Sequence, residues 1–269
     1  MISLEELQAG IVLPLDKPRQ WTSFQAVNKV KSVVRSTYGL KKFKIGHAGT
    51  LDPLATGLLL VCIGKATKTI PQLQDGDKVY TGRMVLGATT PCFDLERAID
   101  RHYPYEHVTQ AMLDEVRLQF VGTVMQVPPM FSAVKIDGQR AYEYARIDDP
   151  SATIQPRPVT IYDLELKLIP PESPLAAYDF DPSISSIQPT TANTQLYQNP
   201  QGEVPAQLPQ IEFSVHCGKG TYIRSLARDI GAALGSGAFL ASLRREKIGD
   251  YTVADAIHPN DVANFLTAC

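Results

Sequence analysis

Residues 44–57 read KIGHAGTLDPLATG, and they hold the single acidic residue of a long basic stretch. From Lys17 to Gln74 the chain has ten Lys or Arg residues, and Asp52 is the one Asp or Glu. The whole chain has 28 acidic residues among 269, a density that would place about six in this stretch. The pattern indicates a segment that binds a polyanion and in which one carboxylate is retained for a functional role.

The local sequence predicts that Asp52 lies in a loop. Pro53 disfavours a helical conformation of the residue before it, and Gly46, Gly49 and Gly57 allow tight turns nearby. The basic neighbours favour the ionised carboxylate. Two interpretations stay open: a turn-forming Asp of the common Asp-Pro kind, or a catalytic nucleophile or general base. Metal-assisted phosphodiester cleavage fits poorly, because it needs several acidic residues.

The charge is unevenly distributed along the chain. The whole chain has a formal net charge of −2, which is not typical of a nucleic-acid-binding protein. A second basic stretch, 214–247, has six Lys or Arg against Asp229 and Glu246. If both basic stretches fold onto one face, the protein has a positive groove on a mildly acidic body, and such a groove concentrates a polyanion.

Other features exclude several classes of protein. The four cysteines show no CxxC spacing, and no Cys or His pair has metal-ligand spacing, so we expect neither a disulfide framework nor a metal site. The N-terminus MISLEELQAG lacks the basic start of a signal peptide, and the longest apolar run, LLLVCI at 58–63, is too short to span a bilayer. We expect a cytoplasmic protein that does not bind membranes.

The pattern of apolar residues predicts an α+β fold, because strands and helices do not alternate regularly. Predicted strands lie at 11–15, 58–63, 78–86 and 133–136. Predicted helices lie at 24–34 after an N-cap at Ser23, at 66–73, at 109–120, and from an N-cap at Thr221 to Gly235.

Residues 170–209 differ from the rest of the chain. They contain eight of the twenty prolines and no Lys, Arg or His. Alternating apolar residues flank them, at 159–168 and 211–217. We interpret the segment as a poorly ordered insertion in a β-hairpin, and the alternative is a linker between domains.

Several blocks of the sequence resemble one known family. The block GHAGTLDPLATGLLLVCIGKATK, at 46–68, closely resembles the active-site motif of the TruB family, the tRNA pseudouridine-55 synthases. Four further blocks resemble other motifs of the family, in order: LDKP…WTS (15–23), KVY…LGATT (78–90), QVPPMFSAVKIDGQRAYEYAR (126–146) and CGKGTYIRSLARDIGAALG (217–235). Together they cover about residues 11–250.

The resemblance implies a fold and an activity. The fold would be that of pseudouridine synthases, with a central mixed, mostly antiparallel sheet flanked by helices and loops. Residues 1–250 would form the catalytic domain and 251–269 a short tail, without the PUA domain that bacterial members often carry. The protein would be a monomer that binds the T stem-loop of tRNA without an obligate protein partner. It would convert the uridine at position 55 to pseudouridine after base flipping, with no cofactor and no metal.

The resemblance also implies roles for six residues. Asp52 would be the catalytic aspartate, acting on the ribose or the uracil or assisting glycosidic cleavage. Tyr80 would stack on the flipped base, and Arg224 would pair with Asp52. The other three would bind the substrate or support the site: His47, which fills the space left by flipped nucleotides, Lys17 in the N-terminal motif, and Leu243, which lines the pocket.

The chain departs from the family pattern at Gln20, where the family usually has Gly, and at Pro91-Cys92-Phe93, which replaces a polar stretch. Two other functions remain possible on sequence alone. One is a related synthase with another RNA target or a guide complex. The other is a non-catalytic RNA-binding protein with the same fold.

Overall fold

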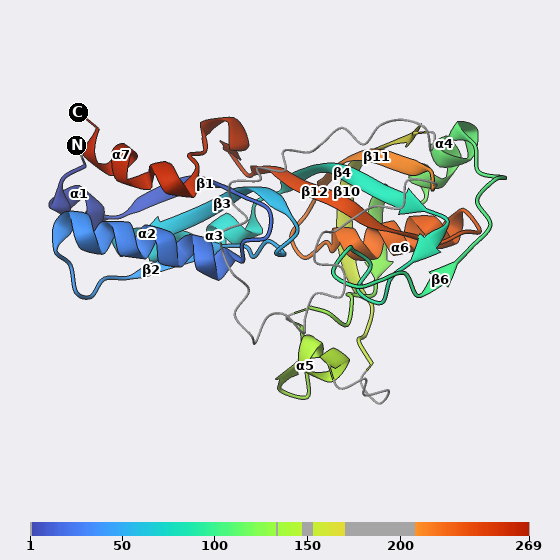
Figure 1. The fold of residues 1–269 in the computed structure, drawn as a ribbon, viewed down its shortest axis with the longest axis horizontal. Helices are drawn as coiled ribbons and strands as arrows, with labels where there is room; N and C mark the ends of the chain where they lie inside the picture. The colour runs from blue at the N-terminus through green and yellow to red at the C-terminus, as the bar shows by residue number, and fades with distance from the viewer. Residues whose placement is uncertain (1, 133, 147–152, 170–207, 269) are drawn as a thin grey trace. The chain divides into compact units, whose positions relative to one another are not determined.

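The computed structural model describes residues 2–132, 134–146, 153–169 and 208–268 (Figure 1). The protein is α+β, with a central sheet flanked by helices, as expected. It divides into two compact units, Met1–Thr81 with Leu243–Cys269, and Gly82–Ser242. Two long strands, β4 (Lys78–Leu86) and β12 (Ala238–Ile248), pass from one unit into the other along their length.

The first unit is built around β3 (Thr56–Ile63), whose residues are buried except for the first. Burial on both faces explains its continuous apolar sequence. One edge of β3 pairs antiparallel with β1 (Ile11–Lys17). The other edge pairs with β2 (Ile45–Ala48) near its end and, in parallel, with β12 near its start. The loop from β2 to β3, which contains Asp52, therefore lies beside β12.

Helices and short strands complete the first unit. Helix α2 (Ser23–Tyr38) packs against α7 (Val262–Thr267) (Figure 1). The remaining elements of the unit are α1 (Leu4–Ala9), η1 (Gly64–Thr69), α3 (Ile70–Asp75), β13 (Tyr251–Thr252), η3 (Val253–Asp255) and η4 (Pro259–Asp261).

The second unit has the strand order β4–β11–β10–β7. Strand β10 (Arg157–Ile169) pairs antiparallel with β11 (Gln210–Cys217) and with β7 (Gly122–Gln126). Its remaining elements are β5 (Ala88–Thr89), β6 (Arg101–His102), α4 (Gln110–Leu118), β8 (Lys135–Ile136), β9 (Gln139–Arg140), α5 (Ala141–Arg146) and α6 (Ile223–Ala233). The prediction of a mixed, mostly antiparallel sheet is confirmed. The β3–β12 pair is parallel, and the pairs β1–β3, β2–β3, β10–β11 and β7–β10 are antiparallel.

The two strands that flank 170–209 pair with each other, as the hairpin interpretation expects. The β10–β11 register runs to Ile169 opposite Gln210, and both strands belong to the same unit. The interpretation of the segment as an insertion in a hairpin stays a prediction. The prediction that it is poorly ordered falls on 170–207, which lie outside the described residues.

Two predicted helix caps are wrong. Helix α2 begins at Ser23, and the cap is Thr22, whose hydroxyl accepts a hydrogen bond from the Gln25 N–H in a capping box. Helix α6 begins at Ile223, and the Thr221 hydroxyl instead donates to the carbonyl oxygen of Gly218. A hydroxyl near a helix start has several backbone partners within reach, so sequence alone does not choose among them.

No helix in the described ranges is long and apolar enough to cross a membrane.

The division into a catalytic domain at 1–250 and a tail at 251–269 stays a prediction. In the structure, residues of this tail form β13, η3, η4 and α7, which belong to the first unit.

Candidate active site

Asp52 lies in the loop that joins β2 to β3, which we call the Asp52 loop (residues 49–55). Gly49 opens this loop with φ +91°, and Gly57 follows it with φ +98°, both in the left-handed region. The loop closes on itself through a hydrogen bond of 3.1 Å from the Ala55 N–H to the Asp52 carbonyl oxygen. The prediction that Asp52 lies in a loop is confirmed.

Ser23 fixes the backbone directly before Asp52. Its buried hydroxyl accepts a hydrogen bond of 2.9 Å from the Leu51 N–H and donates one of 3.1 Å to the Leu51 carbonyl oxygen. Thr22 caps α2, and this leaves the Ser23 side chain available to the loop. The residue expected to cap the helix therefore positions the candidate catalytic loop.

Lys17 fixes the backbone directly after Asp52. Its fully buried ammonium group donates to the carbonyl oxygens of Trp21 at 2.7 Å, Pro18 at 2.9 Å and Pro53 at 3.4 Å. The Gln20 N–H also donates to the Pro53 oxygen, at 2.7 Å, with Gln20 at φ +67°. A left-handed backbone explains why the TruB family usually has Gly at this position, and Gln20 adopts it at some energetic cost.

Arg245 joins the two ends of the Asp52 loop, and sequence reasoning missed it. This buried residue of β12 donates from Nε to the Leu58 carbonyl oxygen at 2.8 Å and from Nη2 to the Gly49 oxygen at 3.0 Å. Its neighbour Arg244 differs, because it is partly exposed and forms a bidentate ion pair with Asp16. Only the tertiary structure distinguishes the two arginines of this Arg-Arg pair.

The two buried cations shape the electrostatics around Asp52. Burial lowers the pKa of Lys17 to about 7, and this effect is partly opposed by the attraction of Asp52 and increased by Arg245. Burial and the charge of Arg245 also lower the pKa of His47, against a weaker opposing effect of the Gly49 backbone. The lowered pKa favours the neutral form of His47, whereas the pKa of Lys17 lies near 7.

The structure places three other predicted residues in the same unit. His47 lies on β2, opposite Val61 of β3. Leu243 lies on β12, and its carbonyl oxygen accepts a hydrogen bond of 3.5 Å from the hydroxyl of Thr56, at the end of the Asp52 loop. Tyr80 is buried on β4, as are Met84 and Leu86, two and three periods of the strand alternation further on.

Arg224 belongs to the second unit, on α6. Its guanidinium group donates to the carbonyl oxygens of Cys92 at 3.2 Å and Phe131 at 2.8 Å, and its Nε lies 3.6 Å from Oδ2 of Asp94. Arg224 and Asp94 are both buried. Sequence reasoning missed Asp94, and the expected pairing of Arg224 with Asp52 stays a prediction.

Arg228, one turn after Arg224, contacts the same segments. Its Nη2 donates to the Val127 carbonyl oxygen at 3.0 Å, and its guanidinium carbon lies 5.2 Å from the centre of the Phe93 ring. Phe93 has a left-handed backbone, with φ +59°, in the stretch where the chain departs from the TruB pattern. The two arginines therefore lie on one side of α6.

The chemistry available around Asp52 is that of one carboxylate among buried cations. Within the described ranges, no group of three or more His, Cys, Asp or Glu residues is arranged to hold a metal ion. A carboxylate whose backbone is fixed on both sides can serve as a nucleophile or as a general base. A catalytic group that is already held in the reactive geometry lowers the entropic cost of reaching the transition state.

The pseudouridine synthase fold agrees with the comparisons to known proteins. The N-terminal domain model of TruB family pseudouridylate synthases matches residues 35–186, and the C-terminal domain model of tRNA pseudouridylate synthase B matches 224–268. The chain belongs to the TruB family.

Curated relatives are similar over nearly their whole length. The chain is 48% identical to a tRNA pseudouridine synthase B of Flavobacterium johnsoniae, over 94% of both chains. It is 42% identical to one of Parabacteroides distasonis, over 96% of this chain and 94% of the relative. Among solved structures, it is similar to a chain of a Cbf5-Nop10-Gar1 complex, with a TM-score of 0.61 and 26% identity. That match covers 96% of this chain and 55% of the other, so the protein spans about half of that longer chain.

Proposed function

We propose that this protein is a tRNA pseudouridine synthase that isomerises the uridine at position 55 of the T loop. The observation that carries the proposal is the Asp52 loop, in which buried Ser23, Lys17 and Arg245 fix the backbone on both sides of one carboxylate. Membership in the TruB family and near full-length similarity to tRNA pseudouridine synthases support the reaction.

The reaction is an isomerisation, so its atoms balance without a cofactor. The target uridine leaves the RNA stack, at a cost of a few kcal/mol that binding must offset. With Asp52 as the catalytic group, the bond from N1 to the ribose breaks, the uracil turns, and C5 bonds to the ribose. The C5 proton leaves, and N1 gains a proton.

The other predicted residues have supporting roles in this proposal. Tyr80 stacks on the flipped base, Leu243 lines its pocket, and His47 fills the space that the base vacates. In this proposal Arg224 holds the Asp52 carboxylate ionised. Asp94, whose Oδ2 lies 3.6 Å from Nε of Arg224, orients that guanidinium group. The proposed partner is the T stem-loop of tRNA. We further propose a monomer that needs no protein partner and acts in the cytoplasm.

The test uses purified protein, an unmodified tRNA transcript and no added cofactor. Carbodiimide labelling followed by primer extension locates any pseudouridine. We expect one new stop at the T-loop uridine with the wild type and none with Asp52→Asn, which should still bind tRNA. Asp250→Asn, which changes an exposed carboxylate of the same unit, is the matched control and should retain activity.

Two results would contradict the proposal. Pseudouridine formation by Asp52→Asn would show that Asp52 is not essential. No stop with the wild type, while tRNA binding remains, would favour a guide-dependent synthase or a binding protein. A guide-dependent enzyme is inert on naked tRNA and active when its guide complex is supplied, which separates these two.

A further inference from the structure

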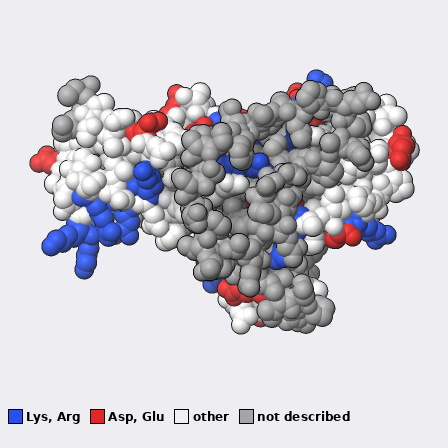
Figure 2. Space-filling view, in the orientation of Figure 1, with Lys and Arg blue, Asp and Glu red and all other residues white. Residues whose placement is uncertain are grey.

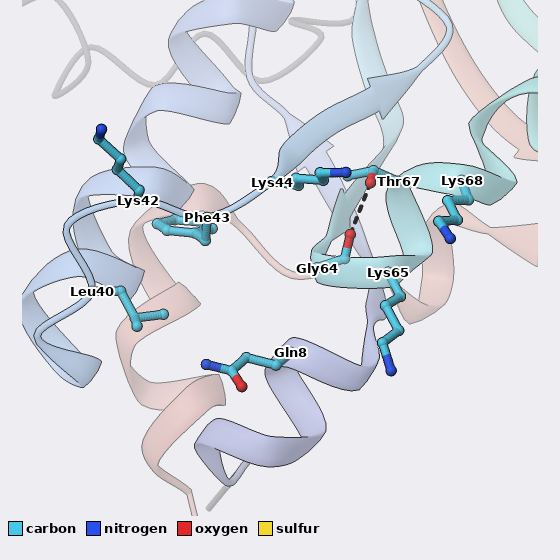
Figure 3. Close-up of a pocket in the computed structure, with 9 residues that line it drawn as sticks. All are labelled: Gln8, Leu40, Lys42, Phe43, Lys44, Gly64, Lys65, Thr67 and Lys68. Atoms are coloured by element: carbon cyan, nitrogen blue, oxygen red, sulfur yellow. Dashed lines mark hydrogen bonds between the residues drawn. The ribbon is translucent and has the colours of Figure 1, made fainter.

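The first unit has a basic pocket away from the Asp52 loop. Figure 2 shows Lys and Arg side chains gathered around the turn that follows α2, at the lower left of the view. A hollow of about 370 Å³ lies there, between α1, this turn and η1 (Figure 3). We call it the lysine pocket, because four of the residues that line it are lysines: Lys42, Lys44, Lys65 and Lys68.

The charge of the lysine pocket has no partner among the described residues. All four lysines are exposed, and none of them forms an ion pair with a described carboxylate. The nearest acidic residues in the sequence of α1 are Glu5 and Glu6, and Glu6 accepts a hydrogen bond from the Ser3 N–H. Four like charges around one hollow repel each other, and a bound anion removes that cost.

The walls of the lysine pocket suit more than a bare phosphate ion. Leu40 and Phe43 are half-buried and border the hollow opposite Lys65 in Figure 3. The Thr67 hydroxyl, which donates to the Gly64 oxygen at 2.8 Å, can also accept a hydrogen bond. Apolar and aromatic surface beside several lysines is the arrangement that holds a nucleotide by its sugar or base and its phosphate.

The lysine pocket lies at the far end of β3 from the Asp52 loop. Gly64, which follows β3, donates from its N–H to the Lys44 carbonyl oxygen at 2.9 Å, whereas the loop enters β3 at Thr56. Eight strand residues at about 3.3 Å each separate the two places by roughly 25 Å. A separation of this size corresponds to several nucleotides along an RNA strand, so one RNA molecule can reach both places.

We propose that the lysine pocket binds the sugar–phosphate backbone of the substrate tRNA, several nucleotides away from the uridine that reacts. The proposal rests on the proposed function in one respect, that the RNA substrate is a tRNA. It adds a second contact that holds the RNA body while the target base leaves its stack. Contacts of this kind supply binding energy without reading the base sequence.

A lysine footprint tests the location directly. The protein is labelled with an amine-reactive acylating reagent, with and without excess unmodified tRNA transcript, and labelled lysines are quantified by mass spectrometry. We expect tRNA to protect Lys44 and Lys65 at least threefold more than Lys29 and Lys31 of α2, which lie outside the pocket. Equal protection of both pairs, or equal protection by inorganic phosphate at the same phosphate concentration, would overturn the proposal.

Paired variants test the energetic contribution. For Lys44→Gln/Lys65→Gln, the slope of log affinity for tRNA against log salt should fall by about 2, close to one per lost phosphate contact. At about 50 mM salt this corresponds to a loss of affinity of tenfold or more. The control Lys29→Gln/Lys31→Gln has the same net charge and should change the slope by less than 1. An equal loss in both double variants would overturn the proposal.

The outcome is separable from that of the proposed function. Suppose that the wild type forms pseudouridine, that tRNA does not protect the pocket lysines, and that Lys44→Gln/Lys65→Gln does not change the salt slope. The proposal that the lysine pocket binds tRNA is then wrong, and the proposed function stands. If the wild type forms no pseudouridine but the footprint and slope change appear, the pocket stands as an RNA site and the proposed activity fails.

Discussion

At the scale of single residues, the first unit has two buried cations whose partners are backbone carbonyl groups. Lys17 and Arg245 are at most 2% exposed, and charged side chains are rarely buried to this extent without a partner. Both Arg245 hydrogen bonds and one of the three made by Lys17 go to carbonyl oxygens on either side of Asp52 in the chain. The desolvation of the cations is thereby offset, and the position of the loop is fixed by the same contacts.

The first prediction concerns Arg245. Replacement by Met leaves the carbonyl oxygens of Gly49 and Leu58 without their donor, so we expect the free energy of unfolding to fall by about 3 kcal/mol. The turnover number kcat should fall at least tenfold with little change in KM, because the loop that contains Asp52 loses the two hydrogen bonds that hold it in place. Arg245→Lys should give an intermediate kcat. An unchanged kcat in the Met variant at a temperature where it is folded would refute a positioning role.

The second prediction concerns Lys17 and pH. Its pKa is about 7 in the folded protein, below the ordinary value near 10.5 that applies to the unfolded chain. Between these values the unfolded chain binds a proton that the folded protein does not, so the stability of the folded state increases with pH. The unfolding free energy of the wild type minus that of Lys17→Met should therefore rise from pH 7 to 9, by up to about 1.4 kcal/mol per unit. Urea titrations measure it, and a flat difference would mean that the folded pKa is not lowered.

At the scale of elements, the site depends on the close approach of β3 and β12. Gly57 has φ +98°, and a Cβ added there would overlap the carbonyl oxygen of Arg245. The two strands can pair in parallel at Arg245 and Gly57 because Gly57 has no side chain. This pairing brings β12, with Leu243 and Arg245, next to the Asp52 loop.

The third prediction separates the close approach from the backbone conformation. Gly57→Ala should lower the free energy of unfolding by about 3 kcal/mol, because strain and overlap both act. Gly39→Ala is the control, since Gly39 also has a left-handed backbone, with φ +67°, but nothing lies within 4 Å of the added Cβ. It should cost about 1 kcal/mol. Equal losses in denaturant titrations would show that strand packing at Gly57 contributes nothing.

At the scale of the whole molecule, net charge is a poor guide to binding. The protein has a formal charge of −2, yet the first unit presents the lysine pocket without acidic partners among the residues described. Exposed charges further apart than a Debye length, about 8 Å at physiological salt, are largely screened from one another. Local charge at the binding surface therefore decides the interaction with RNA.

The fourth prediction concerns the segment between β10 and β11. Replacement of 175–205 by a short Gly-Ser turn should leave the unfolding midpoint and kcat/KM nearly unchanged. The described strands pair up to Ile169 and Gln210 without it, and the removed residues contain no Lys, Arg or His to bind phosphate. A large fall in kcat/KM with an unchanged midpoint would instead show that this segment contributes to the reaction.

The sequence by itself determined the α+β class, the main strands, the hairpin and the loop around Asp52. These features follow from local causes: apolar periodicity, glycines, a proline, and the absence of other acidic residues from one stretch. The TruB motifs indicated the family for the same reason, because each motif is a contiguous run of residues.

The tertiary structure alone decided which residues brace that loop. Ser23, Lys17 and Arg245 come from three distant places in the chain, and their partners are backbone carbonyl and N–H groups, which every residue has. Sequence cannot show which backbone groups a side chain will meet, since packing brings them together. For the same reason Arg245 could not be told from Arg244, nor could the hydroxyl of Thr22 be chosen over that of Ser23 as the helix cap.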